Sequence, residues 1–213
     1  MNFSSQTITT KKLLFKLMEH PAAIILAAGK SIRMGKPKPF LKYKNSFFLK
    51  NIIETYKKQV NKITVVFNPY NFLLLFKHYP IYYPNLCFTI NDNINERFYS
   101  IYKGILCLKN YNYIFIQNVD NPSVKLKTIQ LLWKYRNKAD VIIPAYKNLH
   151  GHPILINRNV IAAIKKQNYF HHNLKTFLQQ FTKFYVLIKD RSILENINTL
   201  NEYLKLCENE KSV

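Results

Sequence analysis

AAIILAAGKSIRMGKPK, residues 22–38, is the stretch that decides how this chain folds and what it can bind. Its first half is an apolar run of the length of a strand buried on both faces, and the run stops at Gly29. Its second half gathers backbone N–H groups and cationic side chains where that strand ends. Glycine lets the backbone approach an anion, Ser31 adds a hydroxyl donor, Arg33 a planar fork and Lys38 a point charge. The stretch therefore indicates a phosphate-binding loop.

Two familiar phosphate-binding motifs do not fit this loop. It lacks the G-x-x-x-x-G-K-[ST] spacing of a Walker loop, and Gly29 is not followed by the G-x-G-x-x-G of a dinucleotide site. A tight turn with a solvated basic rim is the structural alternative, because a short Gly-x-Ser pattern is common in turns. The spacing of the whole stretch favours the phosphate loop.

The length and composition indicate one domain without membrane spans. With 213 residues, 48% of them hydrophobic, the chain is long enough for one α/β domain with a large core and too short for two ordinary domains. No apolar run reaches the roughly 18 to 20 residues of a membrane span, and no signal-peptide cleavage pattern is present. We therefore expect a soluble cytoplasmic protein with no membrane partner.

Neither the charge nor the cysteines indicate a nucleic-acid or zinc-binding module. The formal net charge of +21 would attract any polyphosphate, but lysines are spread over nearly every segment and no RNP, KH or zinc-finger pattern occurs. The three cysteines stand far apart without a C-x-x-C pair, which disfavours a disulfide framework or a thiolate zinc site. We expect no specific nucleic-acid partner.

Apolar runs and helical periodicities alternate after the loop. Besides the first strand, strands are predicted at 63–67, 86–90, 113–116, 141–145 and 185–188, and a further apolar run lies at 154–156. Helices are predicted from about 46 to 56, around 72–76, 100–108, 124–135, 160–164 and 174–181, and after a capping box at 199–202. This order predicts a single Rossmann-like, doubly wound α/β domain, with a mostly parallel sheet and helices on both faces.

The domain is predicted to span residues 21–213, and residues 1–20 form an N-terminal extension. Apolar residues of the extension have the spacing of one face of a short helix, and the favoured interpretations are a helical extension or a start assigned upstream of the true one. A basic, Ser/Thr-containing amphipathic start also fits an organelle transit peptide.

Asp120 is a site candidate because of its position. It comes just after the predicted strand 113–116 and before Pro122. Ligands of open α/β sheets bind beyond the carboxyl ends of the strands, although an Asp before Pro is also a common turn residue. The neighbouring phosphate loop favours a functional role for Asp120.

The chain resembles a known family of transferases in five places. The pattern L-A-A-G-x-S-x-R-M-G-x-P-K at 26–38 resembles the signature loop of nucleotidyltransferases built on a Rossmann-like sheet, above all the MobA-like group that contains the molybdenum cofactor cytidylyltransferases. Four other segments resemble the family's nucleotide-pocket segment, its D-x-P metal motif, its G-H-P and its terminal D-I-D-T: E-R-F-Y-S with Gly104 at 96–104, V-D-N-P at 119–122, G-H-P at 151–153 and N-I-N-T at 196–199. The resemblance covers about residues 22–206.

The resemblance implies roles for particular residues. The residues implied to bind the nucleotide are Leu26, Ala27, Ala28, Gly29, Ser31, Arg33, Lys38, Ser100 and Asp120. Of these, Arg33, Lys38 and Asp120 are implied to be catalytic. Asp120 and Asn198 are implied to hold Mg²⁺, and His152 to contact the acceptor. From the residues alone, Ser100 is also explained as a helix-start residue. The loop position of His152 favours a positioning role over core packing, with a hydrogen-bonded structural histidine as the alternative.

Two departures from the family pattern bear on activity. The chain has four glycines in all, fewer than the family's loops usually carry, and Asn198 stands where the family has its second carboxylate. A neutral amide can ligate magnesium but adds no charge to the site. A catalytically degenerate nucleotide-binding module of the same fold is therefore an open alternative.

By resemblance, the activity is transfer of a nucleoside monophosphate to a phosphate-bearing acceptor with release of pyrophosphate. The implied donor is CTP, the implied acceptor molybdopterin and the implied cofactor Mg²⁺. A sugar-phosphate or methylerythritol-phosphate acceptor is the enzymatic alternative, favoured by the arrangement of Glu96, Arg97 and Ser100, which those transferases approximate.

Overall fold

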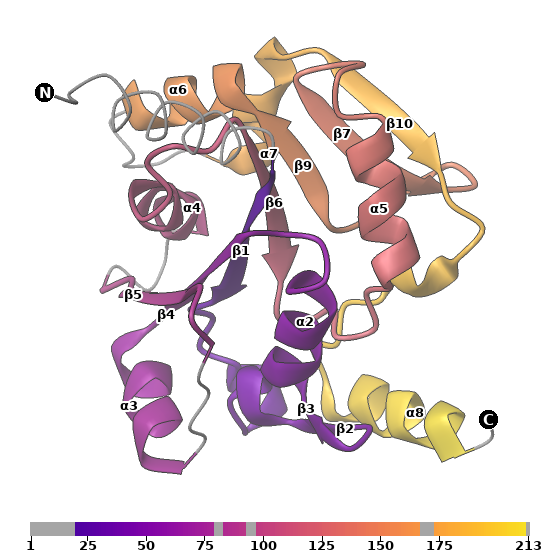
Figure 1. Cartoon of the computed structure of the whole chain (residues 1–213). Coiled ribbons are helices and arrows are strands. Elements are labelled where there is room, and N and C mark those ends of the chain that lie inside the picture. Colours follow the sequence, from indigo (N-terminus) through magenta and orange to yellow (C-terminus); the bar gives the residue numbers. More distant parts are fainter. Residues whose placement is uncertain (1–19, 79–82, 93–96, 167–172, 212–213) are drawn as a thin grey trace, which may run out of the picture.

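A single eight-stranded sheet organises the protein (Figure 1). The structure is a computed structural model that describes residues 20–78, 83–92, 97–166 and 173–211. Residues 1–19 of the predicted N-terminal extension lie outside the described residues. The strand order is β10-β7-β9-β6-β1-β4-β5, with β8 paired to β7. The strands are β1 (Ala22–Ala27), β4 (Lys62–Phe67), β5 (Leu86–Ile90), β6 (Tyr113–Asn118), β7 (Val141–Tyr146), β8 (Leu149–His150), β9 (Ile154–Asn157) and β10 (Lys183–Leu187).

Helices connect the strands, and a small hairpin follows the first loop. The hairpin pairs β2 (Lys42–Tyr43) with β3 (Ser46–Phe47). The α-helices are α2 (Phe48–Tyr56), α3 (Pro69–His78), α4 (Arg97–Leu106), α5 (Leu126–Lys134), α6 (Arg158–Lys166), α7 (Leu174–Phe177) and α8 (Leu200–Lys211). The 3₁₀ helices are η1 (Ile32–Met34), η2 (Lys38–Phe40), η3 (Leu178–Gln180) and η4 (Arg191–Leu194).

The predicted mostly parallel α/β sheet is confirmed, with one reversal that the sequence did not predict. β1 lies parallel between β4 and β6, β5 is parallel to β4, and β10 is parallel to β7. β9 runs antiparallel to both of its neighbours, β6 and β7. The chain reaches β9 through the tight turn between β7 and β8 and not through a helix, so it returns along the sheet in the opposite direction.

Helices cover both faces of the sheet, as predicted, and each face has its own apolar core. α2 and α5 pack with one face, and α4 and α6 pack with the other (Figure 1). α4 lies very close to β1, since a Cβ on Gly104 would stand 2.7 Å from Cγ2 of Ile24. Only glycine permits that approach without a shift of the strand side chain. β1 and α4 are thereby held in close contact.

Two predicted boundaries were wrong. Ser46 does not open a helix, because Ser46–Phe47 pairs as β3 and α2 begins at Phe48. β6 extends two residues beyond the predicted strand, through Gln117 and Asn118. The Gln117 side chain is fully buried, where its Oε1 accepts a hydrogen bond of 3.1 Å from the Tyr56 hydroxyl, so this polar residue belongs to the core and not to a loop.

No helix in the described ranges is long and apolar enough to cross a membrane.

Candidate active site

The phosphate loop and Asp120 meet at the carboxyl ends of two neighbouring strands. β1 and β6 are parallel, with Leu26 in register with Asn118, and the Val119 N–H donates to the Leu26 carbonyl over 3.1 Å. The loop after β1 and the turn after β6 therefore leave the sheet side by side. This is where open α/β sheets bind their ligands.

Two buried asparagines from the next strand connection hold the start of the loop. The Asn68 side-chain amide donates to the Ala28 carbonyl over 3.0 Å, and the Asn71 amide donates to the Ala27 carbonyl over 2.9 Å. Both asparagine residues are less than 5% exposed. The carbonyls that leave β1 are thus already paired, and the following segment is fixed in direction.

Ser31 closes the loop upon itself. Its backbone is left-handed, with φ of 54°, and its Oγ accepts a hydrogen bond of 3.1 Å from the Lys38 backbone N–H. A hydroxyl that accepts one bond still has its own O–H to donate. The predicted role of Ser31 as a donor to phosphate is compatible with this contact.

Lys38 connects the loop to the two residues predicted to hold the metal. Its ammonium donates to Oδ1 of Asn198 over 2.7 Å and lies 3.7 Å from Oδ2 of Asp120. A backbone hydrogen bond of 2.8 Å from the Ile197 N–H to the Asp120 carbonyl brings the two segments together. Residues separated by more than 150 positions in the sequence therefore converge on one ammonium group.

The start of α8 fixes the position of Asn198. The backbone N–H groups of Asn198 and Thr199 donate to Oε2 of Glu202 over 2.7 and 2.8 Å, and the Glu202 N–H returns a bond of 3.3 Å to Oγ1 of Thr199. The structure has the capping box predicted at 199–202. Asn198 is held against Lys38 by a rigid helix terminus, not by a free tail.

Burial perturbs the charged groups of this cluster. Burial lowers the pKa of Lys38 and raises that of Asp120, while the attraction between the two groups opposes both shifts. The Lys38 side chain is 14% exposed and that of Asp120 25%. Oppositely charged groups that are partly desolvated are typical of sites where a charged ligand completes the electrostatic balance.

A cavity of about 230 Å³ opens between these segments. Seven of the nine residues predicted to bind nucleotide line it: Leu26, Ala28, Gly29, Ser31, Lys38, Ser100 and Asp120. The other two lie elsewhere in the structure. Ala27 is fully buried in β1, and Arg33 is exposed in η1, where its positive charge contributes to the lowered pKa of Lys38, second to burial.

Ser100 lies on the wall of this cavity that α4 provides. It is 3% exposed, and its Oγ accepts a hydrogen bond of 2.7 Å from the Asn91 side-chain amide. The bond fixes the hydroxyl oxygen while leaving its O–H available to a ligand. Glu96, part of the same sequence segment, lies outside the described residues.

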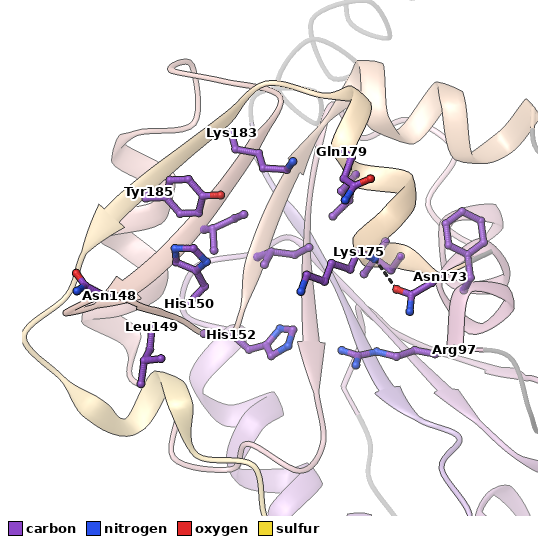
Figure 2. Close-up of a pocket in the computed structure, with 16 residues that line it drawn as sticks. Arg97, Asn148, Leu149, His150, His152, Asn173, Lys175, Gln179, Lys183 and Tyr185 are labelled. Atoms are coloured by element: carbon purple, nitrogen blue, oxygen red, sulfur yellow. Dashed lines mark hydrogen bonds between the residues drawn. The ribbon is translucent and has the colours of Figure 1, made fainter.

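His152 lines a second, larger cavity of about 960 Å³. Burial, followed by the nearby positive charge of Arg97, lowers the pKa of His152 to about 4, so the ring is neutral at pH 7. Its Nδ1 is buried without a hydrogen-bond partner in the described structure. Figure 2 shows the His152 ring and the Arg97 guanidinium pointing toward one another.

The residues predicted to hold Mg²⁺ fit that role in chemistry, with one carboxylate. Asp120 has a buried Oδ1 that accepts no hydrogen bond from any described group, and its Oδ2 and the Asn198 Oδ1 both face the Lys38 ammonium. Mg²⁺ prefers oxygen ligands and commonly uses one or two carboxylates together with substrate phosphates and waters. In the described ranges, no group of three or more His, Cys, Asp or Glu residues could hold a metal on its own.

The sequence motifs imply no contact or catalytic role for Arg97, although it lies in the segment that resembles the family's nucleotide pocket. Arg97 lines both cavities, and its Nη2 donates to Oδ1 of Asn118 at the end of β6. A lone arginine at a helix start carries no periodicity or motif that distinguishes it from a solvated one. Only the placement of α4 against β6 reveals its position.

Gly29 should matter for ligand binding and not for folding. A Cβ on Gly29 would meet no described atom within 4 Å, yet the residue lines the smaller cavity. We expect Gly29→Val to weaken CTP binding roughly tenfold or more, since one lost phosphate contact and crowding of the backbone approach together exceed 1.4 kcal/mol. Calorimetric titration with CTP measures it, and undiminished affinity contradicts the phosphate-loop assignment.

In contrast to Gly29→Val, the Gly151→Ala variant is expected to affect stability. A Cβ on Gly151 would stand 2.3 Å from the Ile193 carbonyl oxygen, which is backbone and cannot move aside cheaply. We expect a loss of about 1–3 kcal/mol in the free energy of unfolding, as for other overpacked sites. Denaturant unfolding should show this loss for Gly151→Ala and a midpoint close to wild type for Gly29→Val.

The chain is similar in sequence and fold to known proteins. The chain is similar to the molybdenum cofactor cytidylyltransferase of Escherichia coli K12, with 24% identity over 182 residues, covering 85% of this chain and 92% of the relative. It is also similar to the 2-C-methyl-D-erythritol 4-phosphate cytidylyltransferase of Azobacteroides pseudotrichonymphae, with 26% identity over 171 residues, covering 76% and 74%.

A solved structure shares the fold. The crystal structure of Rv0371c from Mycobacterium tuberculosis H37Rv superposes with a TM-score of 0.77 at 14% identity, covering 89% of this chain and 97% of the other. The sequence pattern of the MobA-like NTP transferase domain matches residues 23–186, from the first strand into β10. With the loop, Asp120 and the sheet order in the places described above, the chain belongs to the MobA-like NTP transferase family and is a nucleotidyltransferase by that membership.

Proposed function

We propose that this protein transfers CMP from CTP to a phosphate-bearing acceptor, with release of pyrophosphate, and that molybdopterin is the leading acceptor. The observation that carries the proposal is the convergence of Ser31, Lys38, Asp120 and Asn198 at the carboxyl ends of β1 and β6. The choice of CTP and molybdopterin is supported by the sequence resemblance and by the name of the Escherichia coli relative.

Catalysis of this transfer depends on positioning of the reactants and neutralisation of their charge more than on covalent catalysis by the protein. A phosphate monoester is largely dianionic at neutral pH, since its second pKa is about 6, and needs no general base to become a nucleophile. One of its oxygens bonds to the α-phosphorus of CTP while the bond from that phosphorus to the bridging oxygen breaks. Pyrophosphate leaves with the electron pair of the broken bond.

The residues of the small cavity supply the charge that this reaction needs. Backbone N–H groups near Gly29, with the Ser31 hydroxyl, donate to the triphosphate. Lys38 exchanges its contacts with Asn198 and Asp120 for phosphate oxygens. Arg33 lies in the exposed loop, where it neutralises the departing pyrophosphate. Asp120 and Asn198 would hold Mg²⁺, which when bound would supply positive charge to neutralise the phosphates.

One specific observation favours a second acceptor. Arg97 and Ser100 belong to the segment whose arrangement the methylerythritol-phosphate transferases approximate, and both line the smaller cavity; a 26% identical relative is named for 2-C-methyl-D-erythritol 4-phosphate. A methylerythritol-phosphate or sugar-phosphate acceptor is therefore the alternative substrate for the same reaction.

Pyrophosphate release tests these functions together. We expect release from CTP, and not from ATP, GTP or UTP, when Mg²⁺ and molybdopterin are both present. Release with 2-C-methyl-D-erythritol 4-phosphate instead would establish the alternative acceptor, and release from another triphosphate would overturn the choice of CTP. Binding of CTP by calorimetry without release for any acceptor would identify a non-catalytic nucleotide-binding module.

A further inference from the structure

Arg97 stands at the boundary between the two cavities. Among the described residues that line either cavity, it alone lines both. It begins α4, and its guanidinium reaches the end of β6 to bond Asn118. The residue as a whole is exposed, while burial of the guanidinium lowers its pKa. A cation that is accessible from two adjoining cavities can contact ligands in both.

The neighbours of Arg97 leave most of its donors available. A guanidinium has five N–H donors, and within the described structure one hydrogen bond, to the neutral amide of Asn118, involves this side chain. Asp120 attracts it without forming an ion pair with it in the described structure, and its positive charge also reaches His152. Arg97 therefore lies between the carboxylate of the nucleotide side and the histidine of the larger cavity.

The larger cavity has the chemistry of an anion site. Its described lining includes Arg97, Lys175 and Lys183 and no carboxylate. Figure 2 shows the Lys175 side chain reaching toward His152 and Arg97, and the Lys183 side chain at the far side of the cavity from them. His150 and Tyr185, which also line the cavity, stack with ring centroids 4.3 Å apart. At about 960 Å³, the cavity has room for more than a phosphate group alone.

We propose that the larger cavity is the acceptor site and that Arg97 holds the acceptor's phosphate at the wall shared with the nucleotide cavity. The class of acceptor is a phosphate monoester whose remaining part extends past Lys175 toward Lys183. The neutral His152 ring donates an N–H to the same phosphate without adding charge. This assignment rests on the proposed transfer reaction, and it adds the place from which the attacking oxygen comes.

The geometry gives Arg97 a role in orienting the nucleophile. A guanidinium fork can bind one phosphate bidentately and leave the third oxygen free. When the phosphate is held at the boundary between the two cavities, its free oxygen faces the smaller cavity. In that cavity the phosphate loop would hold the triphosphate of CTP. The bond that forms is from this oxygen to the α-phosphorus, and the bond that breaks is from that phosphorus to the pyrophosphate, so no further reactant is needed.

Phosphate binding to the nucleotide-loaded protein tests the assignment. The protein is saturated with α,β-methylene CTP, which fills the triphosphate position, and inorganic phosphate is then titrated calorimetrically. We expect Arg97→Ala to weaken phosphate binding at least tenfold, because a charge-assisted bidentate contact contributes about 1.5–3 kcal/mol. Affinity for the CTP analogue should change less than threefold. Arg97→Lys, which keeps the charge and loses the fork, should give an intermediate loss and serves if Arg97→Ala does not fold.

Lys103→Ala is the matched control, since it removes one positive charge from the same helix and lines neither cavity. It should leave phosphate binding unchanged, which separates Arg97 from the general positive field of the protein. Equal phosphate affinity of the wild type and both Arg97 variants would overturn the acceptor site alone. A loss confined to the CTP analogue would assign Arg97 to the nucleotide, and failure of the analogue to bind the wild type would overturn the proposed function with this assignment.

Discussion

Lys38→Ala is expected to lower the rate of pyrophosphate release from CTP by roughly 100-fold or more, as removal of one preorganised transition-state contact does in other enzymes. The ammonium is the group that touches both Asp120 and Asn198, and its backbone N–H closes the loop on Ser31. The variant keeps the backbone bond and removes only the charge. We therefore expect the loss in turnover with the fold intact, measured by steady-state kinetics together with circular dichroism.

Lys36→Ala is the control for this variant. Lys36 is exposed in the same loop, two residues away, and does not line the cavity. Its removal changes the net charge by the same amount and should lower turnover less than about threefold, as expected for a screened surface charge. Equal rates for the wild type and Lys38→Ala, with matched circular dichroism spectra, would remove Lys38 from the mechanism.

Arg33→Ala should have a smaller effect than Lys38→Ala. The Arg33 side chain is exposed in η1 and lies outside the cavity lining, so it can act only on the outer phosphates. The two variants measured side by side give the order of importance. A larger loss for Arg33→Ala would mean that the loop closes around the triphosphate when the nucleotide binds.

The fold was predictable where the sequence signal is local. The apolar run before Gly29 gave β1, and the spacing of Thr199 and Glu202 gave the start of α8, because buried strands and capping boxes involve residues close together in the chain. The direction of β9 was not predictable in this way. Strand direction depends on which neighbours the strand joins, and those lie far away in the sequence.

The sequence predicted candidate site residues but not the contacts between them. The resemblance implied roles for Lys38, Asp120 and Asn198, and the structure shows that one ammonium contacts the other two side chains. Arg97 shows the limit of the approach, since its importance arises only from the meeting of α4 with β6 and two cavities. A motif identifies residues that share a role within a family, whereas a shared wall between two cavities exists only in three dimensions.

The Asp120→Asn variant is expected to abolish Mg²⁺-dependent transfer. Among the described residues, Asp120 provides the sole carboxylate in contact with the Lys38 ammonium, which also contacts Asn198. Without it, two amides and the nucleotide would have to hold a strongly hydrated cation, which prefers charged oxygen ligands. Pyrophosphate release measured over a Mg²⁺ titration checks this, and activity that survives in Asp120→Asn would exclude Asp120 as the metal ligand.

Asn198→Asp is expected to have the opposite effect. A carboxylate at this position would replace the amide oxygen that now lies 2.7 Å from the Lys38 ammonium and would place two negative groups around one point. We expect the Mg²⁺ concentration for half-maximal activity to fall roughly tenfold, since affinity of oxygen sites rises with ligand charge. Mn²⁺ binding by electron paramagnetic resonance, with the CTP analogue present, measures the same change without turnover.

Asn196→Asp separates a metal ligand from added negative charge. Asn196 is exposed two residues earlier in the same segment and does not contact Lys38 in the described structure, so the same charge is added away from the site. It should leave the magnesium requirement and Mn²⁺ affinity unchanged. If Asn198→Asp behaves like Asn196→Asp, then position 198 is not at the metal, and its contact with Lys38 serves only to hold α8 against the loop. If Asn198→Asp alone lowers the requirement, the natural asparagine keeps the metal site weak, so that bound nucleotide must supply the missing negative charge.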